Sequence, residues 1–141
     1  MKLTLDSSVI AKLFIDEKDT KNAVSLMEKS IEDGAELIAS DLILYEVGNT
    51  IWKHIRKKKT DGQEYIRQLF FLNIDYLPPN QDTACQTIAL AQEQDITYYD
   101  AVHVMPAKNN ETPLVTEDKE LLEKVDSAIN IKEALGLLEN S

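Results

Sequence analysis

The chain has 141 residues, with 15 Lys and Arg against 25 Asp and Glu, so its formal net charge at pH 7 is −10. Hydrophobic residues make up 43% and charged residues 28%, which excludes wholesale disorder and suits one domain spanning residues 1–141. One cysteine excludes an internal disulfide, and no apolar run reaches the roughly 18 residues of a membrane span. The N-terminus lacks a signal-peptide pattern, so we expect a cytoplasmic protein that does not enter a membrane. The negative charge argues at first against a nucleic-acid partner.

The hydrophobic periodicity predicts strands that alternate with helices. In chain order, the predicted elements are a strand over 2–5, a short helix over 8–14, a helix from 19 or 20 to Gly34, a strand over 36–39, a long helix from 40 or 41 to 55, a helix over 65–72, a strand over 73–77, a helix over 82–94, a short helix that begins at 97–100, a strand over 113–116, a short helix over 120–125, a strand over 128–131 and a helical tail over 132–138. This alternation is typical of an α/β sandwich around a mostly parallel sheet. Such sheets bind ligands beyond the carboxyl ends of their strands, so residues at that edge are candidates for function.

Four acidic residues on separate segments are predicted to lie near this edge. Asp6 follows the first strand, Asp118 follows the fourth, Glu46 lies one or two turns into the long helix, and Asp100 lies near the start of a later helix. Converging carboxylates raise one another's pKa, and a divalent cation removes that cost. Oxygen ligands without Cys or several His favour Mg²⁺ or Mn²⁺, which can activate water and clamp phosphate oxygens. Taken singly, each acid is more often a solvated surface group or a helix cap.

Four short motifs carry these acids in a fixed order. They are Asp6-Ser7-Ser8-Val9-Ile10, Glu46-Val47-Gly48-Asn49, Tyr99-Asp100-Ala101 and Leu114-Val115-Thr116-Glu117-Asp118. Together they resemble the PIN-domain ribonucleases of the VapC toxin type, over the part of the chain from Met1 to about Leu122.

The resemblance implies a three-layer α/β/α sandwich and a ribonuclease that depends on Mg²⁺ or Mn²⁺. It implies that the metal-site carboxylates are Asp6, Glu46, Asp100 and Asp118. It also implies hydroxyl groups near the metals from Ser7 or Ser8 and from Thr116, and a hydrogen bond to the site from Asn49. Members of this family commonly form homodimers, and its toxins are held inactive by a small antitoxin that occupies the acidic groove. The negative net charge predicts a basic segment in that antitoxin.

Two positions depart from the usual pattern of the family, and a third is ambiguous. Pro106 lacks an N–H and clashes one turn back, so the helix that contains Asp100 is expected to kink or end early unless it begins late. His103 is either a proton shuttle or outer-shell group at the groove or, as is more usual, a surface histidine of a helix. Glu117 precedes Asp118, and the resemblance favours Asp118 as the ligand.

The basic residues concentrate in one stretch, which continues the helix of Glu46. The stretch contains Lys53, Arg56, Lys57, Lys58 and Lys59. These residues either bind the RNA backbone that flanks the metals or complement the helix dipole and solubilise a turn. Trp52 and Tyr45 on this helix are predicted to belong to the core or a dimer interface, whereas Tyr98 and Tyr99 are better candidates for contacts near the groove.

Other chemistries find less support in the sequence. Phosphoaspartate chemistry at Asp6 requires a second acid nearby, but Ser7 and Ser8 follow it. The few glycines are scattered, so neither a P-loop nor a dinucleotide site is present. The alternative to a metal-dependent ribonuclease is a non-catalytic PIN-fold module that binds or regulates a partner.

Overall fold

A single parallel sheet forms the centre of the computed structural model, which describes residues 1–141. Its strands are β1 (Lys2–Leu5), β2 (Glu36–Ser40), β3 (Asp75–Leu77), β4 (Leu114–Val115) and β5 (Ala128–Ile129). They lie in the order β3-β2-β1-β4-β5, and every neighbouring pair is parallel. β1 therefore lies in the middle, where its carboxyl end faces the centre of the functional edge.

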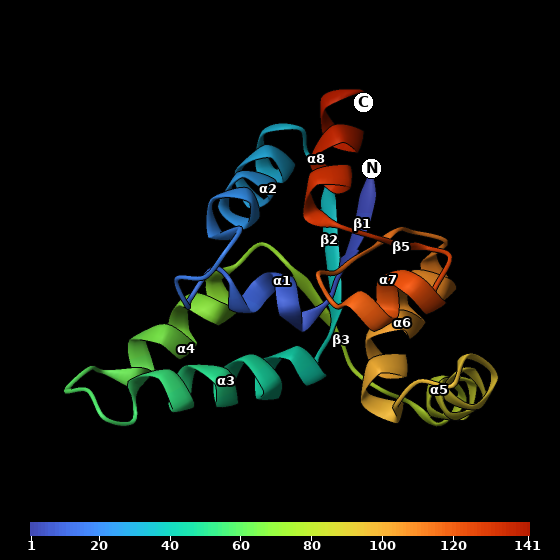
Figure 1. Ribbon diagram of the computed structural model, residues 1–141, viewed down its shortest axis with the longest axis horizontal. Coiled ribbons are helices and arrows are strands. Elements are labelled where there is room, and N and C mark those ends of the chain that lie inside the picture. Colours follow the sequence, from blue (N-terminus) through green and yellow to red (C-terminus); the bar gives the residue numbers. More distant parts are fainter.

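Helices cover both faces of this sheet, so the predicted α/β class and the layered architecture are confirmed. The helices are α1 (Ser7–Ala11), α2 (Thr20–Glu32), α3 (Leu42–Ile55), α4 (Gly62–Phe71), α5 (Gln81–Gln94), α6 (Tyr98–Asn110), α7 (Lys119–Lys124) and α8 (Ile131–Glu139). In Figure 1, α1 to α4 lie on one side of the sheet and α5 to α7 on the other, and α8 lies beside α2. The amino ends of the strands point toward both chain termini, and their carboxyl ends point toward α3 and α6.

The two faces have separate hydrophobic cores because successive residues of a strand point to opposite sides. Val115 of β4 packs into the larger core with residues of α1, α2, α3 and α8. Leu114, its neighbour, packs into the smaller core with residues of α5, α6 and α7. Burying one such side chain stabilises the fold by about 1.5–3 kcal/mol.

Helix α3 owes its orientation to one apolar stripe. Ile43, Val47 and Ile51 recur every four residues and are all buried in the larger core. The same spacing places Glu46 and Asn49 off the buried stripe, at the edge of the sheet. Trp52 and Tyr45 do not belong to the core, because 55% and 76% of their surfaces are exposed, and the predicted dimer interface is the alternative that stays a prediction for them.

Pro106 does not end α6, contrary to the sequence-based expectation of a short helix. The helix runs for 13 residues, with Pro106 in its interior. The ring removes one backbone hydrogen bond, which costs about 3 kcal/mol in a helix. Val104, Met105 and Ala107 around it are buried in the smaller core, and this burial offsets the cost. The other predicted elements differ from the observed ones at their boundaries.

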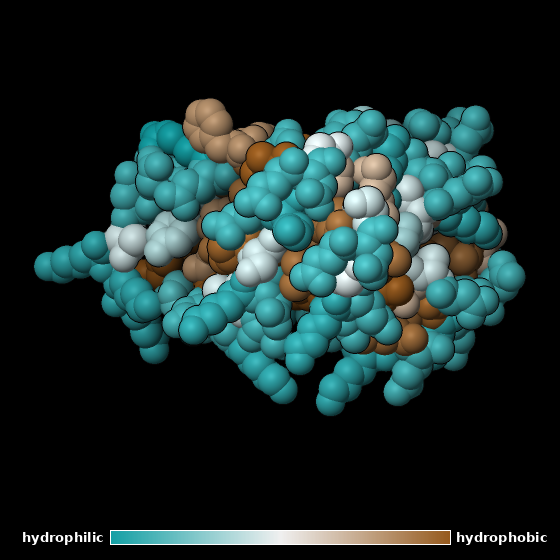
Figure 2. All heavy atoms as spheres, turned by 90° about the horizontal axis from the view of Figure 1, so that it is seen from above, coloured by the Kyte–Doolittle hydropathy of each residue, from teal (hydrophilic) through white to brown (hydrophobic).

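The amino ends of the strands lie at the end of the molecule that Figure 2 shows. That face is mainly hydrophilic, with apolar atoms visible between extended charged side chains. No helix of the structure combines the length and the hydrophobicity needed to cross a bilayer.

Candidate active site

The four predicted carboxylates line one cavity at the carboxyl edge of the sheet. Asp6 follows β1, Glu46 lies in the second turn of α3, Asp100 lies in the first turn of α6, and Asp118 immediately precedes α7. The cavity has a volume of about 330 Å³. Its remaining lining residues are Ser7, Ser8, Ala11, Val47, Asn49, Thr50 and His103. The fold therefore brings together side chains that are up to 112 positions apart in the sequence.

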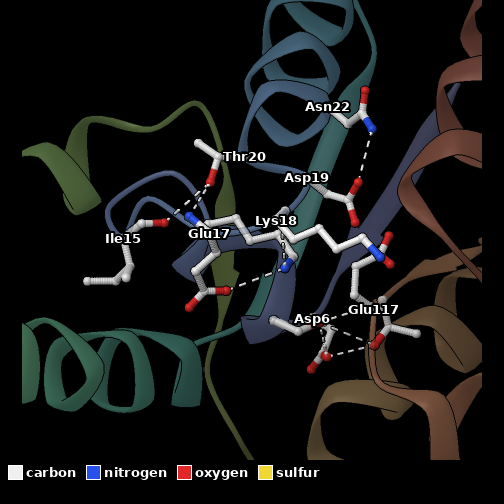
Figure 3. Close-up of polar contacts among 11 residues, drawn as sticks. Asp6, Ile15, Glu17, Lys18, Asp19, Thr20, Asn22 and Glu117 are labelled. Atoms are coloured by element: carbon white, nitrogen blue, oxygen red, sulfur yellow. Dashed lines mark hydrogen bonds and ion pairs between the residues drawn. The ribbon is translucent and has the colours of Figure 1, made fainter.

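Asp6 is held by hydroxyl groups rather than used as a helix cap. It occupies the N-cap position of α1, yet its side chain makes no capping hydrogen bond. Instead, its Oδ2 accepts hydrogen bonds from Ser8 Oγ and Thr116 Oγ1, each at 2.8 Å (Figure 3). Asp6 is 4% exposed, so these bonds satisfy one oxygen of a nearly buried carboxylate. Its Oδ1 makes no hydrogen bond within the protein and stays available to a ligand.

The same hydroxyl groups fix the loop that carries Asp118. Thr116 Oγ1 accepts a hydrogen bond from Asp118 N at 3.0 Å, and Ser8 Oγ accepts one from Glu117 N at 3.1 Å. Asp118 caps α7, because its Oδ1 accepts from Leu121 N at 3.0 Å. Its Oδ2 makes no hydrogen bond within the protein.

Glu117 faces away from the cavity. Its Oε1 accepts a hydrogen bond from Ile131 N at 2.8 Å, at the start of α8. Of the two adjacent acids, only Asp118 lines the cavity, as the resemblance favoured.

His103 of α6 links Glu46 of α3 to Ser40 at the end of β2. Its Nε2 is hydrogen-bonded to Glu46 Oε1, and its Nδ1 lies 3.4 Å from Ser40 Oγ. The hydrogen bond with His103 lowers the pKa of Glu46 against the opposing effect of burial, and the charge of His103 and a hydrogen bond from Ser7 lower it further. Burial alone would lower the pKa of His103, but Glu46 and the charges of Asp6 and Asp100 raise it above its usual value. His103 is therefore a buried partner of Glu46 whose protonated form is favoured, rather than a surface histidine.

Asp100 has the opposite electrostatic environment. Burial raises its pKa, and the negative charges of Asp118 and Asp6 raise it further, while a hydrogen bond with Thr97 and the charge of His103 lower it in part. Excess negative charge therefore accumulates on the side of the cavity formed by Asp6, Asp100 and Asp118.

The donor set fits a hard divalent cation. All four acids offer oxygen atoms, and Oδ1 of Asp6 and Oδ2 of Asp118 are free of protein hydrogen bonds. No three His, Cys, Asp or Glu side chains are close enough together to hold a metal ion by themselves. Mg²⁺ usually binds one or two carboxylates and completes its coordination with waters and substrate phosphates, so a ready three-ligand centre is not required.

The other predicted site residues differ in how closely they contact the four acids. Ser8 and Thr116 contact Asp6 directly, and Ser7 favours the ionised form of Glu46. Asn49 lines the cavity, and its side chain makes no hydrogen bond within the protein, so its predicted bond to the site stays a prediction. The basic stretch is not part of the cavity: it forms the last turn of α3 and the segment that follows, and Lys53, Arg56, Lys57, Lys58 and Lys59 are all exposed.

A tethered loop connects α1 to α2 near this site. Lys12 Nζ donates to Lys18 O at 3.1 Å and pairs with Glu17 Oε2 at 3.4 Å. Thr20 Oγ1 accepts from Glu17 N at 2.9 Å (Figure 3). These bonds order the segment that follows α1, the helix directly after Asp6.

The family of the chain follows from comparisons with known proteins. A family model described as the PIN domain matches residues 3–128. Ribonuclease VapC3 of Pyrobaculum aerophilum is 30% identical over 133 residues, which cover 92% of this chain and 98% of that protein. Exonuclease VapC9 of the same organism is 30% identical over 108 residues, which cover 77% of this chain and 81% of that protein.

Solved structures share the fold. PAE2754 from Pyrobaculum aerophilum matches with a TM-score of 0.72 and 24% identity, and all of both chains is covered. VapC20 of Mycobacterium tuberculosis, described as a toxin that cleaves the sarcin–ricin loop, matches with a TM-score of 0.68 and 12% identity, over 86% of this chain and 93% of that one. The family model covers most of the chain, and the chain therefore belongs to the PIN-domain family.

Proposed function

We propose that this protein is a ribonuclease that hydrolyses RNA phosphodiester bonds with Mg²⁺ or Mn²⁺. One observation carries the proposal: four carboxylates from four separate segments line a single cavity at the carboxyl edge of the sheet. Identity of 30% along nearly the whole of Ribonuclease VapC3 supports RNA as the substrate. An endonucleolytic mode is part of the proposal.

The roles of the residues follow from their contacts. Asp6, Glu46, Asp100 and Asp118 would supply the carboxylate oxygens for the metal, one or two directly and the others through bound waters, and the metal, when bound, supplies an activated water and charge stabilisation at the phosphate. Ser8 and Thr116 fix Asp6 so that one oxygen remains directed to ligands. His103 holds Glu46 ionised and in place. No side-chain nucleophile is needed, and the one cysteine is exposed on α5, away from the cavity.

The proposal extends to partners. As a toxin of the VapC type, the protein would form a homodimer and would be inhibited by a small antitoxin. The net charge of −10 and the acidic cavity favour a basic antitoxin segment. Coexpression with the protein encoded beside it tests this: a stable copurified complex that suppresses RNA cleavage is expected, whereas unchanged cleavage in its presence would contradict it.

Cleavage of a mixed RNA pool tests the activity itself. Purified protein should cut RNA when Mn²⁺ or Mg²⁺ is supplied and stop when a chelator is added. Uncut RNA under all metal conditions would refute the nuclease and would favour the non-catalytic binding module.

A further inference from the structure

The exposed end of α3 combines an aromatic ring with a cluster of positive charge. Trp52 is 55% exposed, and the guanidinium of Arg56 lies 5.6 Å from the centroid of its ring. This is a cation–π arrangement on the surface of the protein. Lys57, Lys58 and Lys59 follow directly and are also exposed.

These cations have no acidic partner. The ion pairs of the chain involve Lys2, Lys12, Arg67, His103 and Lys124, and none includes a cation of the basic stretch. Five of the 15 Lys and Arg residues are thus concentrated and unpaired in a chain whose net charge is −10. The helix dipole accounts for attraction of cations to the last turn of α3, but not for an exposed tryptophan stacked with one of them.

Part of the stretch is aligned with the acidic cavity, whereas Trp52 lies about 120° around α3 from Glu46 and lines a separate cavity between α3 and α4 with Gly48 and Ile66. Glu46 and Thr50 line the acidic cavity, and Lys53 continues the same face of α3 because it follows Glu46 by two helical turns. In Figure 1, α3 runs from the carboxyl edge of β2 outward to the end that bears these residues. At about 1.5 Å per residue, Trp52 lies about 9 Å along the axis of α3 from Glu46, and the lysines 57–59 follow the end of the helix at Ile55.

We propose that Trp52, Arg56 and the lysines 53 and 57–59 bind a single-stranded segment of the RNA substrate next to the cleavage site. This inference rests on the proposed ribonuclease function and specifies its substrate. Stacked nucleotides rise by about 3.4 Å each, so the axial distance from Glu46 to Trp52 corresponds to about three nucleotides. The indole stacks on an unpaired base, and the cations contact flanking phosphates. A base in a duplex is not free to stack in this way, so the flank must be unpaired.

The charge of this surface distinguishes RNA from the other proposed partners. A basic antitoxin segment is repelled by five unpaired cations, and a symmetric contact of two copies of the chain through this surface would place two such clusters together. RNA neutralises them.

Equilibrium binding of labelled RNA tests the inference, with all proteins carrying Asp118→Asn so that the RNA stays intact. Trp52→Ala is expected to weaken binding of a long unpaired oligonucleotide about tenfold, and Trp52→Phe to restore most of it. Replacing Lys53, Lys57, Lys58 and Lys59 by Gln is expected to reduce the salt slope of log K by about 0.7 per lost phosphate contact. The matched control, Lys108→Gln with Lys132→Gln, removes exposed lysines from α6 and α8 and should leave binding unchanged.

Substrate length supplies a second readout. Trp52→Ala should no longer matter when the oligonucleotide is shortened to two nucleotides, or when the flank is paired. Equal binding of the long oligonucleotide by Trp52→Ala and the control would overturn the inference. Loss of binding together with a change of oligomeric mass would also overturn it, because the surface would then be an interface between copies of the chain. If the unmodified protein binds RNA through Trp52 but cuts none with Mn²⁺, the ribonuclease proposal fails and this binding surface stands.

Discussion

His103 Nε2 is hydrogen-bonded to Glu46 Oε1 across 57 positions of sequence, and this bond joins α6 to α3 at the edge of the acidic cavity. The imidazole is 2% exposed while the carboxylate remains partly open to solvent. The acids around this buried imidazole favour its protonated form, and that charge in turn reduces the repulsion among them.

The pair makes stability depend on pH in a defined direction. The pKa of Glu46 is lowered from 4.5. The contribution of Glu46 to the free energy of unfolding is therefore present above pH 4.5 and is lost as the pH falls through the folded-state pKa. The pKa of His103 is raised from 6.5. The contribution of His103 to the free energy of unfolding is therefore present below pH 6.5 and is lost as the pH rises through the folded-state pKa. His103→Gln should therefore lower Tm most between pH 4.5 and 6.5. Thermal unfolding across the pH range checks this, and an equal loss of Tm at every pH would contradict it.

Thr116→Val should damage both stability and activity. Thr116 is fully buried, and its hydroxyl donates to Asp6 and accepts from Asp118 N. Valine has a similar shape but leaves both groups without this partner, which costs about 1–3 kcal/mol of unfolding free energy. Loss of an orienting partner usually lowers metal affinity or activity about 10- to 100-fold. Thr116→Ser keeps the hydroxyl and should retain most of both, as denaturant unfolding and cleavage rates can show.

Asp100→Asn should raise Tm in a metal-free buffer while it abolishes cleavage. Its raised pKa means that the ionised carboxylate is disfavoured in the folded state at neutral pH. Removing the charge relieves repulsion by Asp6 and Asp118, so the gain should vanish at acidic pH, where Asp100 of the unmodified protein is protonated. A lower Tm of the variant at neutral pH would contradict this, because it would show that the ionised Asp100 carboxylate stabilises the metal-free fold.

Divalent cations should stabilise the protein through the same carboxylates. A ligand at a hundredfold excess over its Kd adds about 2.7 kcal/mol to the unfolding free energy. Millimolar Mn²⁺ should therefore raise the Tm of the unmodified protein and leave that of Asp6→Asn almost unchanged. A rise of equal size in both proteins would place the cation elsewhere.

The sequence predicted the fold class and the positions of Asp6 and Asp118 because both depend on local patterns. Strand and helix periodicities alternate, and Asp6 and Asp118 directly follow strands whose carboxyl ends meet at one edge. Position alone is weaker evidence for Glu46 and Asp100, because an acid on a helix is usually a surface group or a cap, and the family resemblance adds to it. That all four line one cavity is a result of the three-dimensional structure.

Long-range packing set the features that the sequence left open. No local signal pairs His103 with Glu46, because the partner arrives from a helix 57 positions away. Pro106 signals the end of a helix, but the buried residues around it determine that α6 continues. Tryptophan is a large apolar residue that is usually mostly buried. Only the position of the buried stripe of α3 shows that Trp52 faces solvent.

The adjacent acids Glu117 and Asp118 allow the most direct test of the acidic cavity as a metal-dependent ribonuclease site. Asp118 lines the cavity, whereas Glu117 accepts from Ile131 N at the start of α8, a bond that glutamine preserves. Cleavage of labelled single-stranded RNA with Mn²⁺ should be lost in Asp118→Asn and retained in Glu117→Gln. Equal cleavage by the two variants would contradict the assignment.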